Sequence, residues 1–168
     1  MSALARTLAA ALVVAGCAPE PLAPAEDWVE TGFALRLSGA ASTTGEPSAP
    51  LDLTDFRALS QGRTQVRVTA LSLEVLDFDP TTPTQLASGE VKLAASEGAA
   101  AGFTVAFRDL PIGELGRKDV TVEAAAQDAS ALLLGKDAVS LRWKYALDVV
   151  PARFNLKVKL KLRAVEAP

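Results

Sequence analysis

The chain has no histidine and only one cysteine among its 168 residues. A zinc site built from histidine and cysteine, a Ser-His-Asp triad and a Cys-His pair are therefore all excluded within it. A single thiol also excludes a disulfide within the chain. Aromatic residues are scarce, with six Phe, two Trp and one Tyr. These absences remove most of the common catalytic and metal-binding groups.

The net charge and the length of the chain narrow the classes of protein that remain possible. The 17 basic and 20 acidic residues give a net charge of −3, and the length fits one domain with appendages. A glycosidase needs only two carboxylates, but no local motif selects a pair among the twenty acids. Calcium binding by Asp52, Asp55, Asp77 and Asp79 is not favoured, because their spacing matches no EF-hand. We therefore expect a protein that is not an enzyme and holds no metal.

The first seventeen residues carry the clearest signal. Arg6 precedes an apolar run from Leu8 to Ala15. This run is far shorter than the roughly 20 apolar residues that a membrane-spanning helix needs. A short apolar segment behind a basic residue is typical of a secretory signal peptide. We expect residues 1–16 to form this signal peptide, as a helix.

The run ends in Val14-Ala15-Gly16-Cys17, which resembles the lipobox of bacterial lipoproteins. The resemblance implies that Cys17 receives a diacylglycerol on its thiol and an acyl chain on its new amine after cleavage. It implies no other cofactor. In such lipoproteins, Asp directly after the lipidated cysteine retains the protein at the inner membrane. Here that position is Ala18, so the resemblance implies the outer membrane. The alternative is that Cys17 is a buried structural thiol. The proline-rich sequence that follows it makes this alternative the poorer one.

Residues 17–30 are expected to form the lipidated N-terminus and a flexible tether. Three prolines within six residues, Pro19, Pro21 and Pro24, favour an extended backbone. The folded domain is then expected over residues 31–165, close to a membrane that it does not span.

The domain shows the two-residue hydrophobic period of β-strands. The period changes phase within residues 66–75, which predicts a β-bulge or a strand covered on both faces. Seven or eight short strands predict an all-β fold, an antiparallel β-sandwich of immunoglobulin-like or transthyretin-like type. Residues 38–50 are expected to be a loop, and 54–59 a helical turn capped by Thr54. The expected strands lie near residues 33–37, 66–75, 91–93, 103–107, 120–124, 132–134, 141–149 and 154–162.

A short motif adds to the fold prediction. Leu110-Pro111-Ile112-Gly113, followed by a strand at Val120, resembles the turn that precedes a core strand in transthyretin-like and carboxypeptidase-regulatory-like sandwiches. This resemblance implies a fold and no function.

The last two strands can be paired as a hairpin from the sequence. With Val149 opposite Phe154, Leu147 meets Leu156 and Trp143 meets Leu160, so that successive apolar pairs share one face. The opposite face of this hairpin is then basic, and residues 142–163 hold seven Lys or Arg against one acid, a net charge of +6. Its predicted surface consists of Arg142, Lys144, Lys157, Lys159, Lys161 and Arg163.

Two interpretations of this basic surface remain open. It would bind an acidic envelope component or anionic lipid headgroups, or it is a solvated outer face whose lysines protect an edge strand. Nucleic acid is not an expected partner, because the basic face carries no interleaved aromatic residues. We thus expect a membrane-anchored envelope lipoprotein that acts as an interaction or structural module. The alternative is a carrier with a lipid or other apolar ligand between its sheets.

Overall fold

The computed structural model describes residues 22–38, 42–78, 85–112, 116–122, 128–148 and 152–166. Within these residues the chain forms nine strands and two short helices. The elements are β1 (Ala25–Leu37), β2 (Thr44–Gly45), β3 (Ser48–Asp52), α1 (Thr54–Leu59), β4 (Gln65–Leu76), β5 (Gln85–Ala94), β6 (Phe103–Pro111), β7 (Arg117–Thr121), α2 (Ser130–Leu133), β8 (Ala138–Leu147) and β9 (Ala152–Val165).

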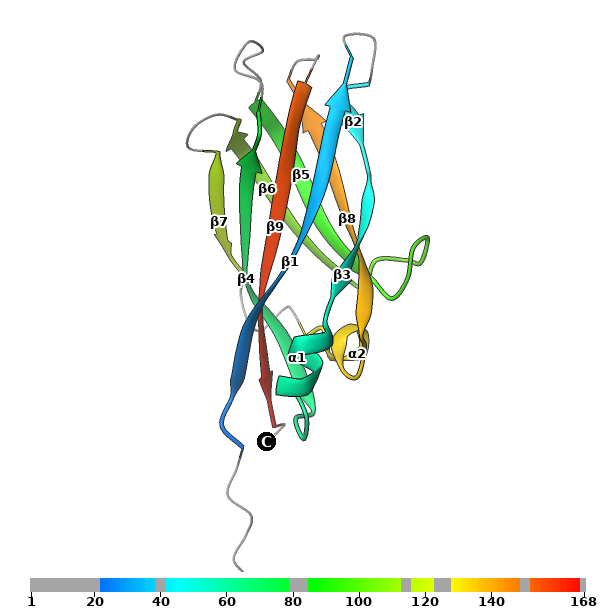
Figure 1. The fold of residues 1–168 in the computed structure, drawn as a ribbon, viewed down its shortest axis with the longest axis vertical. Coiled ribbons are helices and arrows are strands. Elements are labelled where there is room, and N and C mark those ends of the chain that lie inside the picture. The colour runs from blue at the N-terminus through cyan, green and yellow to red at the C-terminus, as the bar shows by residue number, and fades with distance from the viewer. Residues whose placement is uncertain are drawn as a thin grey trace, which may run out of the picture.

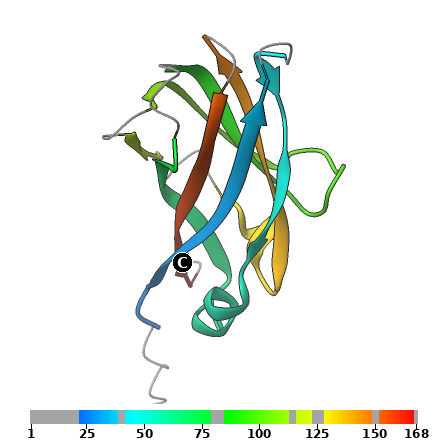
Figure 2. The ribbon, with the colours of Figure 1, turned by 45° about the horizontal axis from the view of Figure 1, so that its top comes forward.

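The strands form two antiparallel sheets that pack face to face (Figures 1 and 2). Sheet A has the order β1-β9-β4-β7, and sheet B has β8 between β5 and the short strands β2 and β3, with β6 beyond β5. The predicted antiparallel β-sandwich is confirmed. If β2 and β3 count as one strand, each sheet has four, and every connection except β5–β6 crosses between sheets. This is the double-sheet arrangement of a jelly roll, and its strand order differs from that of an immunoglobulin domain.

The predicted hairpin of the last two strands is wrong. β8 lies in sheet B, where Trp143 is opposite Val91, and β9 lies in sheet A, where Leu156 is opposite Phe33. The apolar faces of both strands do point into the core, as the alternation predicts. They meet there across the sandwich instead of side by side in one sheet, because alternation specifies a face and not a neighbour.

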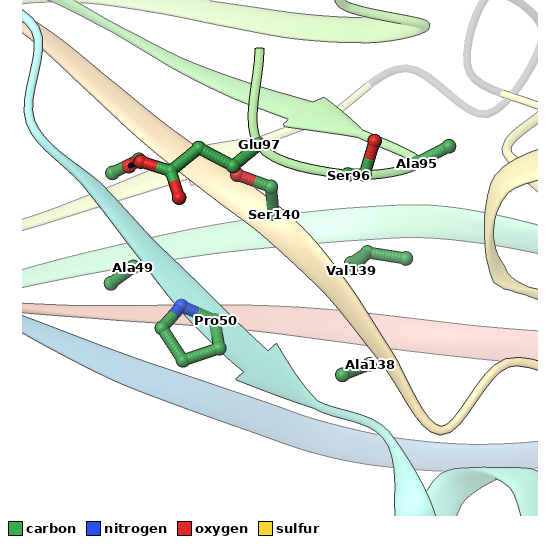
Figure 3. Close-up of a pocket in the computed structure, with 9 residues that line it drawn as sticks. Ala49, Pro50, Ala95, Ser96, Glu97, Ala138, Val139 and Ser140 are labelled. Atoms are coloured by element: carbon green, nitrogen blue, oxygen red, sulfur yellow. Dashed lines mark hydrogen bonds between the residues drawn. The ribbon is translucent and has the colours of Figure 1, made fainter. Parts of the chain in front are cut away.

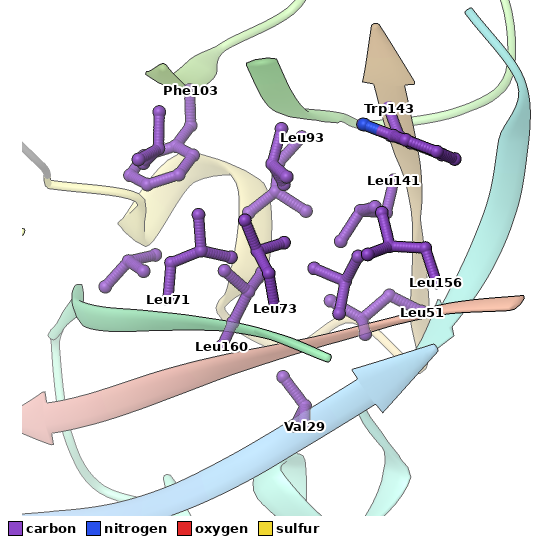
Figure 4. Packing of buried hydrophobic residues seen from close by; sticks show 14 of the residues in the cluster. Val29, Leu51, Leu71, Leu73, Leu93, Phe103, Leu141, Trp143, Leu156 and Leu160 are labelled. Carbon is purple, nitrogen blue, oxygen red and sulfur yellow. The ribbon is translucent and has the colours of Figure 1, made fainter. Parts of the chain in front are cut away.

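The core between the sheets contains many leucines, with Trp143 among them (Figure 4), and a cluster of aromatic side chains around Trp143. Trp143 is fully buried, and its ring lies 6.1 Å from that of Phe154 across the sandwich and 5.8 Å from that of Phe33. Tyr145 completes the cluster at 4.9 Å from Trp143. These rings contact one another across the core and join the two sheets.

Both helices lie at the end of the sandwich where β1 begins and β9 ends (Figure 1). The helical turn at 54–59 is confirmed, but Thr54 is its first residue and not its cap, because the N-cap position is Leu53. The Asp52 carboxylate accepts hydrogen bonds from the Thr54 backbone N–H at 2.9 Å and from the Thr54 hydroxyl at 2.7 Å. Residues 130–133 form α2, so the strand predicted near 132–134 is wrong. At the start of α2, the Asp128 carboxylate accepts a hydrogen bond from the backbone N–H of Ser130, as Asp52 does from Thr54.

The structure tests three further predictions, which concern the bulge in β4, the loop over 38–50 and the tether. The bulge in β4 is confirmed as a register shift between Val68 and Ala70. The loop predicted over 38–50 is wrong for its second half, because β2 and β3 pair with β8 despite their polar composition. The tether is shorter than expected, since β1 starts at Ala25 and pairs with β9 from that residue on. No helix in the described ranges is long and apolar enough to cross a membrane.

Candidate functional site

The end of the sandwich that carries α1 also receives the chain from the predicted lipid attachment residue. Cys17 lies outside the described residues, and Leu22 is the first described residue after it. Leu22 lies at the α1 end, so this end of the sandwich is joined to Cys17 by the shortest stretch of chain.

Arg63, in the connection between α1 and β4, holds the incoming chain. Its guanidinium donates to the carbonyl oxygen of Ala23 through Nη2 at 2.6 Å and Nε at 3.2 Å. Its Nη1 donates to the carbonyl oxygen of Leu59 at 2.6 Å. The planar fork of an arginine suits such multiple contacts, and it fastens residue 23 to the last turn of α1. The Leu22 backbone N–H adds a bond to the Glu166 carboxylate at 3.1 Å.

Two leucines lie exposed on either side of this arginine. Leu22 is 45% exposed and Leu59 is 48% exposed. Leu22 packs over Gly62, where a side-chain carbon would come within 2.9 Å of the leucine methyl. A hollow of about 590 Å³ opens between the α1–β4 and α2–β8 connections, lined by Arg57, Ser60, Gln61, Gly62, Arg63, Thr64, Leu134 and Gly135.

The predicted basic surface does not exist as one face. Arg142 and Lys144 lie on the outer face of sheet B, while Lys157, Lys159, Lys161 and Arg163 lie on the outer face of sheet A. The division follows directly from the placement of β8 and β9 in different sheets. The predicted hairpin register would have placed Lys144 beside Lys159 and Arg142 beside Lys161, but in the structure the members of each pair lie on opposite outer faces.

On sheet A the basic residues of β9 face acids from its neighbours. The Lys157 ammonium lies 2.7 Å from the Glu30 carboxylate, and that of Lys161 lies 2.8 Å from Glu26. Lys159 lies 3.9 Å from Glu30 and 4.0 Å from Glu74. Its partner strands thus supply a carboxylate on each side. The hydrogen bond from Lys161 and the charge of that lysine hold the pKa of Glu26 below its ordinary value.

On sheet B the same compensation occurs. Lys92 lies 3.2 Å from Glu46 and 3.4 Å from Glu90, and Lys144 lies 4.0 Å from Glu90. Arg142 donates to the carbonyl oxygen of Ala99 at 2.7 Å, which ties the β5–β6 loop to this face. Both outer faces are therefore mixed in charge, as is usual for solvated strands.

A hollow of about 440 Å³ lies over the outer side of sheet B, where the β5–β6 loop approaches β3 and β8 (Figure 3). Small side chains such as Ala49, Ala138 and Ser140 line it. Glu97 supplies its one carboxylate, which accepts a hydrogen bond from Ser48 at 3.0 Å. A single carboxylate that is already bonded to a serine does not form a recognisable reactive group.

The aspartates considered for calcium do not converge. Asp52 binds Thr54 at the α1 end, whereas Asp77 follows β4 at the far end and accepts from Asn155 at 2.7 Å. Asp79 lies outside the described residues. Hydrogen bonds from Thr54 hold the pKa of Asp52 below its ordinary value. In the part of the chain that the structure describes, no three acidic or cysteine side chains are grouped as metal ligands would be.

Leu59 and Arg63 at the α1 end belong to no motif that marks them in the sequence. Helical spacing would place Leu59 three residues after the buried Phe56 and on the same side as it. Arg63 contacts Ala23 across forty residues of sequence. No local pattern signals either feature, so the structure was needed to find them.

Comparisons with known proteins show only distant similarity. No protein-family model matches the chain, and no curated protein matches it. Among solved structures, Desmodium yellow mottle tymovirus is 10% identical with a TM-score of 0.34, covering 99% of this chain and 95% of that one. The decameric BFDV capsid protein is 8% identical with a TM-score of 0.43, covering 84% and 99%. Turnip yellow mosaic virus is 14% identical with a TM-score of 0.34, covering 99% and 89%. No function of the present chain follows from similarity at this level.

Proposed function

We propose that this chain is a lipid-anchored protein of the bacterial envelope, and that its β-sandwich is a non-catalytic interaction or structural module. The observation that carries the proposal is the order of segments. An apolar run ends in Val14-Ala15-Gly16-Cys17, and β1 begins eight residues after Cys17, at Ala25. Diacyl and N-acyl chains together give a stable anchor, which a single chain does not. Ala18 directs the protein to the outer membrane.

The packing of the sandwich favours an interaction module over a carrier. The centre between the sheets is occupied by Trp143, Phe154 and Phe33, and the leucines around them are fully buried. The hollows described above lie on the outer side of sheet B and at the α1 end. An apolar ligand between the sheets would have to displace this aromatic cluster. The carrier alternative therefore has less support.

The basic surface is not part of the proposal. Its six residues occupy two faces, and the lysines of β9 lie against Glu26, Glu30 and Glu74. A partner that binds through charge would meet both signs on either sheet. Contacts through the loops or through the ends of the sandwich are better supported.

Membrane fractionation of the native host tests the anchor. The unaltered chain should partition into detergent with the membrane fraction, and Cys17→Ser should be released from it, because serine offers no thiol to the lipid. The matched control is Ala18→Ser, which places the same side chain one residue later and should stay with the membrane. If Cys17→Ser remained in the membrane fraction, the proposed anchor would be wrong.

A further inference from the structure

Two of the large apolar side chains that are exposed in the described residues lie at the α1 end. The described residues include four such side chains: Leu22, Trp28, Leu59 and Leu76. Leu22 and Leu59 flank Arg63, which binds both the Leu59 carbonyl and the Ala23 carbonyl. Leu76 ends β4 at the opposite end of the sandwich (Figure 1). The α1 end therefore exposes two leucines, and Arg63 fixes the backbone at or beside each of them.

The position of Cys17 limits what can lie against this end. Leu22 lies five positions after Cys17, and an extended chain covers about 3.5 Å per residue, so Cys17 lies within roughly 18 Å of Leu22. The fourteen residues of β9 give the sandwich a length of about 45 Å at the usual strand rise. A membrane that holds the acyl chains of Cys17 is thus close to the α1 end and far from Leu76.

The charge of this end indicates how such a contact is made. Arg57, Lys136, Asp55 and Asp137 are exposed there, and Arg57 pairs with Asp137. Arg63 is engaged with carbonyl oxygens and is not available to a phosphate group. With both signs present, attraction to anionic headgroups has little net effect. The contact is instead apolar, as for side chains that enter the headgroup–acyl boundary of a bilayer.

We infer that the α1 end docks on the lipid surface in which Cys17 is anchored, with Leu22 and Leu59 at the headgroup–acyl boundary. This inference rests on the proposed anchor. Arg63 acts as the positioning residue, because it fixes the chain at Ala23 against α1 and so holds the long axis of the sandwich away from the membrane. The opposite end, with Leu76, then points toward partners.

Tryptophan quenching by brominated lipid tests the docking. Leu59→Trp and Leu76→Trp are made separately in a Trp28→Phe background, where buried Trp143 gives a constant signal. Each acylated protein is placed in phosphatidylcholine vesicles with or without bromine on the acyl chains. Leu59→Trp should lose most of the emission added by its new tryptophan, while Leu76→Trp should lose almost none. Added salt should leave this difference unchanged.

Several results would overturn the docking. Equal emission of Leu59→Trp in both kinds of vesicle would show that residue 59 stays in water. Equal quenching of Leu76→Trp would show that the sandwich lies on its side. A blue-shifted, concentration-dependent emission of Leu59→Trp without vesicles would show that a second copy covers this end.

The anchor and the docking can fail separately. The intact mass of the same sample reports acylation of Cys17, and its absence would contradict the proposed function. If acylation is absent, docking would be measured by the same quenching experiment on the chain coupled through the Cys17 thiol to a maleimide phospholipid. In either form, Arg63→Gln should reduce the difference in quenching between residues 59 and 76. Arg57→Gln, at the same end but without a bond to Ala23, should preserve it, and equal effects of the two would exclude the positioning role of Arg63.

Discussion

Two glycines of sheet B make room for aromatic rings. Gly45 lies opposite Tyr145, and Gly89 lies opposite Phe107. A side-chain carbon on Gly89 would come within 2.4 Å of the Phe107 ring, and one on Gly45 within 2.6 Å of the Tyr145 hydroxyl. A ring that covers a strand glycine restores the apolar contact that glycine cannot make itself. These two residues are therefore fixed by packing, although neither needs a positive φ.

We expect Gly89→Ala to lower the free energy of unfolding by about 1–3 kcal/mol, because the added methyl overpacks the core against Phe107. Urea unfolding measures the change. Gly32→Ala is the control, since its nearest contact would be the Leu156 carbonyl oxygen at 3.9 Å and it should be neutral or slightly stabilising. Equal destabilisation by the two substitutions would contradict the packing described here.

Asp52 and Asp128 each precede a helix and bind the residue two positions later. Hydrogen bonds from Thr54 lower the pKa of Asp52, and hydrogen bonds from Ser130 lower the pKa of Asp128, relative to the ordinary value of 3.8. A carboxylate whose pKa is lower in the folded state binds its proton more weakly there than in the unfolded chain. Its stabilising effect is present above pH 3.8 and is lost as the pH falls through the folded value.

The melting temperature should therefore fall as the pH drops below about 3.8, the ordinary Asp value. The double variant Asp52→Asn and Asp128→Asn should have a shallower dependence in that range, because its amides do not titrate. It should also melt at a lower temperature at neutral pH, where the charged acceptors are lost. Thermal unfolding monitored by circular dichroism across this range is the measurement. Parallel curves for the two proteins would mean that neither aspartate contributes through its charge.

At the scale of strands, the sequence predicts faces well and neighbours poorly. The alternation in β9 places Leu156 and Leu160 in the core correctly, and the phase change in β4 marks a real bulge. The hairpin failed because two strands with complementary apolar faces satisfy the same pattern across a core as within a sheet. β2 and β3 escaped prediction because edge strands with one partner tolerate polar residues and proline.

The neighbours of β9 can be tested by a double-mutant cycle. Glu30→Gln and Lys157→Gln should show a coupling of about 0.2–1 kcal/mol in unfolding free energy, the range for exposed ion pairs. Lys144→Gln and Lys159→Gln should show none, because those lysines lie on opposite outer faces. A coupling between Lys144 and Lys159 with none between Glu30 and Lys157 would contradict this placement and support the hairpin of β8 with β9.

At the scale of the whole molecule, the two outer faces are charge-balanced and the two ends differ. The α1 end holds the incoming chain through Arg63 and exposes Leu22 and Leu59. The sequence alone predicts the anchor residue Cys17, since that signal is local. It does not predict the surface around Arg63, which forms only when residues forty positions apart meet. The proposed docking would orient the sandwich by this one end on its membrane.

The proposed lipid anchor can be tested by the mass of the intact protein from membranes of its native host. We expect a chain that begins at Cys17 and carries diacylglycerol and an additional acyl chain, with no residue of 1–16 retained. Fragmentation should place the added mass on Cys17. A chain that begins at Met1 with an unmodified Cys17 would contradict the anchor and the proposed function with it.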